Sequence, residues 1–115
     1  QRLPREIGLK PALGMMLTGR RVSAQEGKEL GFVNEVVAPG EVMEAARAWA
    51  DQILECGPLS VRASKEVAYK SMSMASLEDS LRAEYPTMKT LRASKDFIEG
   101  PKAFAEKRAP NWRGE

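Results

Sequence analysis

The residue types in this chain restrict the chemistry that it can carry. Its 115 residues include no histidine and a single cysteine, Cys56. Without histidine there is no Ser-His-Asp triad and no Cys-His pair for nucleophilic catalysis, and the usual ligand set of a structural zinc site is also missing. Neither a P-loop nor a GxGxxG sequence occurs. Any reaction would therefore use carboxylates, lysines, tyrosines or backbone dipoles.

Three glutamates are the first candidates for a general acid or base: Glu26, Glu35 and Glu99. Each has a simpler structural explanation. Glu26 follows Ser23 at the spacing of a helix capping box, Glu35 lies on a predicted strand at the surface, and Glu99 lies on the surface of a predicted helix. We therefore assign no catalytic residue within this sequence.

A cluster of cations stands near the end of the last predicted helix, beside the aromatic Phe104. From the residues alone, Phe104 is expected in a core or an interface. Lys107 is expected to be a surface lysine or a cation that the helix C-terminus favours. The net charge is only +2 and the basic residues are spread along the chain, so we expect no nucleic-acid partner.

Composition places the chain among soluble globular proteins. It is 43% hydrophobic and 30% charged, which suits one domain with a modest core. No apolar run approaches the roughly 20 residues of a membrane span. A single cysteine excludes an internal disulfide and favours a reducing compartment, so we expect the cytoplasm. The chain begins with Gln1, so its start leaves targeting open.

Hydrophobic spacing, capping residues and prolines predict a mainly α-helical chain with one short strand. Pro86 is expected to kink one helix, and Pro101 is a point where the last helix can divide into a turn and a helix. The predicted helices cover residues 3–7, 9–17, 24–30, 41–56, 59–71, a segment that begins at Ser76 and continues past Pro86, and a final segment from Ser94 to near Arg108.

The predicted strand covers residues 32–37, where β-branched residues partly alternate before Ala38-Pro39-Gly40. No second strand is predicted in the chain, and an unpaired strand edge is not stable by itself. This pattern indicates an incomplete structure, in which a missing part or another copy supplies the partner.

Three blocks of this sequence resemble the crotonase (enoyl-CoA hydratase/isomerase) superfamily. Residues 1–8 are similar to the segment after the family's Pro-Gly-x-Gly-Gly turn. Residues 15–37 resemble its LTG…ISAxEA…GLVxxV run, and residues 94–112 resemble its DxxEGxxAFxEKRxPxW ending. The blocks occur in the family's order and spacing and span somewhat under half of a usual member.

The resemblance implies the C-terminal helical (trimerisation) region of a crotonase-like α/β fold, with the core spiral of βαβ turns missing. Residues 1–40 would be the end of the crotonase core, and residues 41–115 the C-terminal helical assembly region. Self-association as a homotrimer or a dimer of trimers is the partner that this implies.

The implied activity is that of an enzyme acting on acyl-CoA thioesters, a lyase or an isomerase in fatty acid metabolism. Backbone N–H groups of an oxyanion hole would stabilise the enolate, and glutamates would handle the proton and the water. All of these groups would lie on the missing half, so the fragment alone is expected to be inactive. Coenzyme A would enter as part of the substrate, with no tightly bound cofactor and no metal.

Within the family, the closing helix lies near the CoA of a neighbouring subunit. The matching residues are Phe104, which would pack by the adenine, and Lys107, which would reach the ADP phosphates. Arg108 is the weaker alternative for a phosphate contact. In the first part of the chain, Leu13, Met16 and Leu17 are expected in a helix core, with contact to the acyl group as the alternative.

Two further interpretations remain open. A related crotonase, such as a carnitinyl-CoA dehydratase-like enzyme, fits these residues equally well. The chain is also consistent with a non-catalytic helical oligomerisation module, in which the apolar faces of the helices beginning at Glu41 and Ser76 meet other copies.

Overall fold

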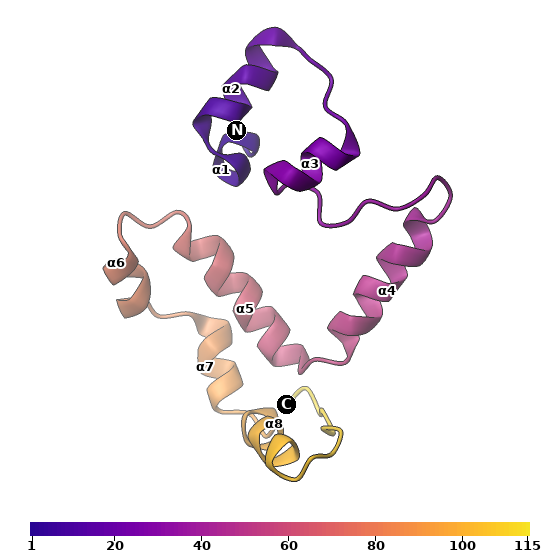
Figure 1. The fold of residues 1–115 in the computed structure, drawn as a ribbon. Coiled ribbons are helices and arrows are strands. Elements are labelled where there is room, and N and C mark those ends of the chain that lie inside the picture. The colour runs from indigo at the N-terminus through magenta and orange to yellow at the C-terminus, as the bar shows by residue number, and fades with distance from the viewer. The chain divides into compact units, whose positions relative to one another are not determined.

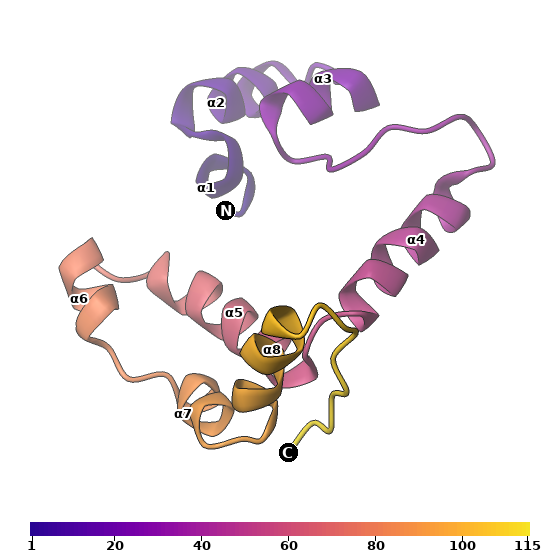
Figure 2. The ribbon, with the colours of Figure 1, turned by 60° about the horizontal axis from the view of Figure 1, so that its bottom comes forward.

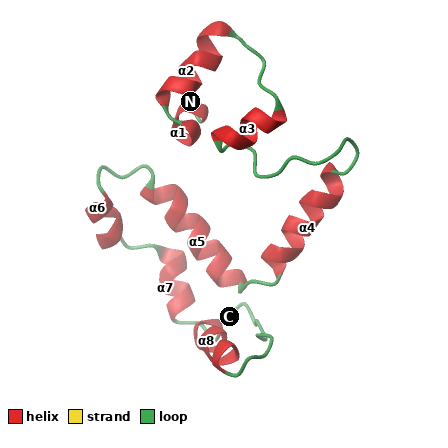
Figure 3. Ribbon diagram, viewed as in Figure 1, coloured by secondary structure: helices red, strands yellow, loops and turns green.

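The computed structural model describes residues 1–115 and contains helices but no strand (Figure 1, Figure 3). Its contacts divide the chain into two units, Gln1–Ala46 and Arg47–Glu115, which are described separately. None of the helices is long and apolar enough to cross a membrane. The helices are α1 (Leu3–Ile7), α2 (Leu9–Thr18), α3 (Ala24–Leu30), α4 (Val42–Leu54), α5 (Pro58–Ser71), α6 (Leu77–Arg82), α7 (Pro86–Arg92) and α8 (Asp96–Ala105).

The first unit begins with a pair of short helices, α1 and α2, that pack against each other. Gly8 separates them at φ 83°, a backbone conformation that glycine adopts without a steric penalty. Ala12 is the buried residue of α2. The helix ends at Gly19, whose N–H donates to the Met15 carbonyl. The predicted helices 3–7 and 9–17 are therefore confirmed to within one residue.

The start of α3 forms half of the predicted capping box. The Glu26 N–H donates to Ser23 Oγ at 3.1 Å. The Glu26 carboxylate, however, pairs with Arg20 Nη2 at 2.6 Å. The Arg20 hydrogen bond lowers the pKa of Glu26. Glu26 thus links the turn before α3 to its first turn, which is a structural role.

The prediction of a strand at residues 32–37 is wrong for this chain, because no ladder forms there. A strand needs a second extended segment to accept and donate its backbone hydrogen bonds, and nothing in the chain pairs with this one. Instead, the N–H groups of Phe32 and Val33 both donate to the Gly27 carbonyl, at 3.1 and 3.2 Å. Their side chains lie so close that a Cβ on Gly27 would be 2.9 Å from Val33 Cγ2.

The second unit is held together by the packing of α5 against α7 (Figure 2). The buried contacts are made by Leu59 and Ala63 of α5 with Leu91 of α7, and the partly buried Met88 packs against them. Pro58 occupies the first turn of α5, where its missing N–H is harmless. This confirms the predicted start of that helix after Gly57.

Pro86 breaks a helix where the sequence predicted only a kink. Proline disfavours the helical conformation for the residue before it, and Tyr85 is extended, at φ −117° and ψ 113°. Pro86 then becomes the first residue of α7. Across the break, the Tyr85 hydroxyl lies 3.0 Å from both Ser80 Oγ and the Ser80 carbonyl oxygen, which joins the two helices.

The last helix, α8, continues through Pro101 without dividing. Pro101 removes a single backbone donor, and the turns on either side remain helical. Ser94 acts as predicted at its start, because Ser94 Oγ accepts the Phe97 N–H at 3.2 Å. The helix ends at Ala105, earlier than the predicted end near Arg108.

Candidate functional site

The C-terminal end of α8 has the hydrogen bonds of a Schellman turn. The Arg108 N–H donates to the Ala103 carbonyl at 3.1 Å, and the Lys107 N–H donates to the Phe104 carbonyl at 3.2 Å. This pattern requires a left-handed residue directly after the helix cap. Here that residue is Lys107, at φ 53°.

Lys107 is the chain's one non-glycine residue with a positive φ. Glycine is usual at this position because a Cβ in the left-handed conformation costs about 1 kcal/mol. The Lys107 side chain is exposed, and no carboxylate in the structure forms an ion pair with its ammonium group. Because Lys107 lies beyond the helix, helical spacing does not determine its orientation relative to Phe104.

Phe104 lies near the end of α8 with 88% of its surface exposed. It is therefore outside the core of this chain, which contradicts one of its two expected places. A fully exposed aromatic ring is available for stacking on a flat partner or for packing in an interface. The main-chain bond between Lys107 and Phe104 keeps these two candidate residues close together.

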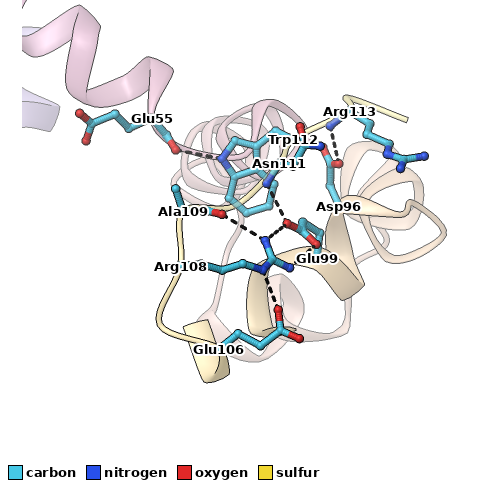
Figure 4. Close-up of polar contacts among 9 residues, drawn as sticks. All are labelled: Glu55, Asp96, Glu99, Glu106, Arg108, Ala109, Asn111, Trp112 and Arg113. Atoms are coloured by element: carbon cyan, nitrogen blue, oxygen red, sulfur yellow. Dashed lines mark hydrogen bonds and ion pairs between the residues drawn. The ribbon is translucent and has the colours of Figure 1, made fainter. Parts of the chain in front are cut away.

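Arg108, the alternative phosphate contact, is already engaged by two carboxylates (Figure 4). Its Nη1 and Nη2 donate to Glu99 at 2.6 and 3.1 Å, and its Nε donates to Glu106 at 2.6 Å. Glu99 also accepts the Asn111 N–H at 2.7 Å. The Arg108 and Asn111 hydrogen bonds lower the pKa of Glu99 to about 2. The structure thus favours Lys107 over Arg108 as the free cation.

The segment after α8 folds back along the second unit, and Asp96 and Trp112 make two of the contacts that hold it there (Figure 4). Asp96 is only 3% exposed, and its carboxylate accepts the N–H groups of Arg113 and Gly114 at 2.8 and 2.9 Å. Trp112 Nε1 donates to the Glu55 carbonyl at 2.9 Å, and this bond joins the tail to the end of α4. The tail after the left-handed turn is therefore fixed on the molecule.

Two hollows lie in the second unit, and neither includes Phe104 or Lys107 in its lining. One, of about 310 Å³, lies between α8 and the tail. The other, of about 910 Å³, lies between α5, α6 and α7. The first is lined by Lys95, Asp96, Ile98, Glu99, Lys102, Asn111 and Arg113. Phe104 and Lys107 thus line neither of these two hollows.

In the first unit, the apolar side chains of α2 do not form the expected helix core. Leu13, Met16 and Leu17 are 39%, 56% and 80% exposed. These three side chains are therefore exposed within the first unit.

Sequence reasoning missed the roles of Asp96 and Glu99 as acceptors for backbone N–H groups of the tail. Both carboxylates bind amides that lie more than ten residues further along the chain. Local spacing rules describe contacts within one or two helical turns, so no pattern in the sequence signals these long-range bonds.

Comparison with known proteins identifies the family. The model of the enoyl-CoA hydratase/isomerase family matches residues 1–115. The carnitinyl-CoA dehydratases of Salmonella typhi and Proteus mirabilis are each 43% identical over 120 residues, which cover 98% of this chain and 44% of each dehydratase.

Solved structures agree with the sequence matches. The enoyl-CoA hydratase from Bacillus anthracis superposes with a TM-score of 0.90 at 41% identity, covering 100% of this chain and 44% of that one. The enoyl-CoA hydratase from Mycobacterium tuberculosis gives 0.87 at 37% identity, covering 99% and 45%. The chain spans less than half the length of these relatives. It belongs to the enoyl-CoA hydratase/isomerase family, as a crotonase fragment of mainly helical structure.

Proposed function

We propose that this chain is the C-terminal part of an enzyme that acts on acyl-CoA thioesters, and that its own contribution is one edge of the coenzyme A site. The observation that carries this proposal is the end of α8. There an exposed Phe104 stands beside Lys107, a lysine in a backbone conformation that favours glycine. Non-glycine residues in such a conformation cluster at functional sites.

The chemistry of the pair suits the nucleotide end of coenzyme A. An aromatic face stacks on a purine, and an ammonium group without a carboxylate partner is free to bind a phosphate. In an assembled enzyme the CoA would belong to a neighbouring subunit, in a homotrimer or a dimer of trimers. Residues 41–115 would be the assembly region and residues 1–40 the end of the catalytic core.

The reaction would be hydration of a 2,3-enoyl-CoA, movement of its double bond, or dehydration of the kind named for the Salmonella and Proteus relatives. We place the oxyanion hole and the glutamates of this reaction outside the chain. Within it, Glu26, Glu66 and Glu99 are held in ion pairs. Turnover of crotonyl-CoA by the 115-residue chain alone would contradict this assignment. We place the enzyme in the cytoplasm.

The test of the CoA role is Lys107→Ala in the intact enzyme. A lost phosphate contact should raise the dissociation constant of a CoA thioester roughly tenfold, or about 1.4 kcal/mol. The effect should be larger at low salt, because salt screens an exposed charge pair. Lys102→Ala is the control, since it removes the same charge from a position five residues earlier, within α8. If the Lys107→Ala and Lys102→Ala variants bind the CoA thioester equally tightly, Lys107 is a surface lysine with no role in CoA binding.

A second candidate function is a helical module that only assembles with other copies. The observation that favours it is the exposure of Leu77 and Leu81 on α6, at 74% and 77%, together with Trp49 and Ile53 of α4. Such faces are normally covered. Loss of CoA binding without loss of assembly in the Lys107→Ala enzyme would separate the two functions.

A further inference from the structure

The left-handed turn at Lys107 is fixed from outside the turn itself. A lysine has no steric reason to remain at φ 53°, so neighbouring contacts must make that conformation the best available. The two main-chain bonds of the turn involve Lys107 and Arg108 as donors. Whatever orients Arg108 and the residues after it therefore also fixes Lys107.

Glu99 is the group that makes those contacts. It lies in α8 with only 19% of its side chain exposed. One of its oxygens accepts from both Arg108 Nη1 and the Asn111 N–H, and the other accepts from Arg108 Nη2 (Figure 4). Through these bonds, one carboxylate holds the side chain of Arg108, which directly follows Lys107, and the backbone of Asn111, four residues after Lys107.

Glu106 does not duplicate this role. It makes one bond to Arg108 Nε from a side chain that is 46% exposed, and its carboxylate accepts no bond from the tail backbone. Isolated exposed pairs of this kind contribute little, whereas a two-pronged arginine–carboxylate pair with an added amide donor fixes geometry. The two glutamates therefore differ in what they can position.

We propose that Glu99 is a positioning residue, which closes the turn after α8 through Arg108 and Asn111, holds Lys107 in its left-handed conformation and so presents the Lys107 ammonium group to a phosphate of coenzyme A. The part that concerns coenzyme A rests on the proposed function. The part that concerns the turn rests only on the geometry of this chain.

The turn is tested by NMR on the labelled 115-residue chain, with Glu99→Gln compared with Glu106→Gln. Glu99→Gln keeps the shape of the side chain but removes the charge that binds Arg108. We expect the Cα and Cβ shifts of Lys107 to move away from left-handed values, and the Asn111 amide to exchange at least tenfold faster. Glu106→Gln should leave both unchanged. A Lys107 that stays left-handed in Glu99→Gln overturns the proposal.

The presentation of the ammonium group is tested by coenzyme A titration of the intact enzyme. If Glu99 acts through Lys107, Glu99→Gln weakens binding severalfold in the wild-type background and not in the Lys107→Ala background. Equal weakening in both backgrounds would show a general structural effect and overturn the positioning role. If Lys107→Ala leaves affinity unchanged while Glu99→Gln releases the turn, the proposed function fails and Glu99 remains the residue that holds the turn.

Discussion

Glu66 caps the N-terminus of α7, a helix whose own cap residue makes no capping hydrogen bond. Its Oε2 accepts the Thr87 N–H at 2.9 Å and also the Thr87 hydroxyl, and its Oε1 pairs with Lys70 at 2.5 Å. Tyr85, at the cap position of α7, makes no side-chain bond to the free N–H groups of that helix. A carboxylate in this place also suits the positive end of the helix dipole. Glu66 therefore joins α5 to α7 beside the buried contacts.

The pH dependence of this contact follows from its charge. The hydrogen bonds from Lys70 and Thr87 lower the pKa of Glu66 from about 4.5 to about 2. Because the pKa is lower in the folded chain, the contact stabilises the fold fully above pH 4.5 and is lost as the pH falls toward 2. Protonation of Glu66 should then release the start of α7.

The capping role of Glu66 is tested with Glu66→Gln, which removes the charge of the side chain and keeps its shape. We expect the Thr87 amide to exchange several times faster at pH 6 than in the unchanged chain. We also expect its protection, taken relative to the intrinsic exchange rate at each pH, to lose its dependence on pH between 4.5 and 2. Hydrogen exchange followed by NMR measures both. Glu78→Gln is the control, because Glu78 is 69% exposed and pairs only with Arg82 on its own helix. An unchanged Thr87 amide would contradict the capping role.

At the scale of elements, Trp112 holds the tail against the corner between α4 and α5. Its ring lies 3.4 Å from the position that a Cβ on Gly57 would take and 3.2 Å from that on Gly100. Both glycines thus leave room for the indole, and the bond from Nε1 to the Glu55 carbonyl fixes its orientation. The tail is anchored within its own chain here.

Replacement of Trp112 should therefore loosen the second unit. We expect Trp112→Phe to lower the free energy of unfolding by about 1 kcal/mol, through the lost hydrogen bond. Trp112→Ala should lower it by about 2 kcal/mol, because the half-buried ring is also removed. Urea denaturation followed by circular dichroism measures both. Phe104→Ala serves as the control, since that ring is 88% exposed and its removal should change stability little.

The elements that sequence predicted well are those with local signals. Ser23, Ser76 and Pro58 mark helix starts that the structure confirms. The strand at residues 32–37 was wrong because no second extended segment of this chain pairs with it. The candidate pair Phe104 and Lys107 followed from the family motif. The left-handed turn that joins this pair to the tail was not predicted. A glycine after the helix would have indicated such a turn, but this chain has a lysine there.

At the scale of the whole molecule, the buried apolar contacts are few. The buried hydrophobic residues are two leucines and three alanines, and no large side chain is completely buried. Long apolar side chains on α2, α4 and α6 stay exposed, including Leu17 at 80% and Leu54 at 77%. Such surface is a normal feature of a piece that packs on other parts of a larger protein. The chain spans less than half of its relatives, and this agrees with that interpretation.

The isolated chain should therefore self-associate. We expect sedimentation velocity to show species larger than a monomer at micromolar concentrations, because exposed apolar side chains on separate copies bury one another. Leu77→Glu with Leu81→Glu should shift the distribution toward monomer. Arg82→Glu, which changes the charge of the same helix in the same direction, should not. A monomer at every concentration would contradict the prediction.

The anchored indole of Trp112 is also a fluorescent probe of whether the tail is docked. The sequence has two tryptophans, so Trp49→Phe leaves Trp112 as the single indole emitter. When the tail is docked, its ring contacts Gly57 and Gly100 and its nitrogen is bonded to the chain rather than to water. Release into solvent would shift its emission to longer wavelength. The docking of the tail on the second unit can thus be followed by fluorescence in real time.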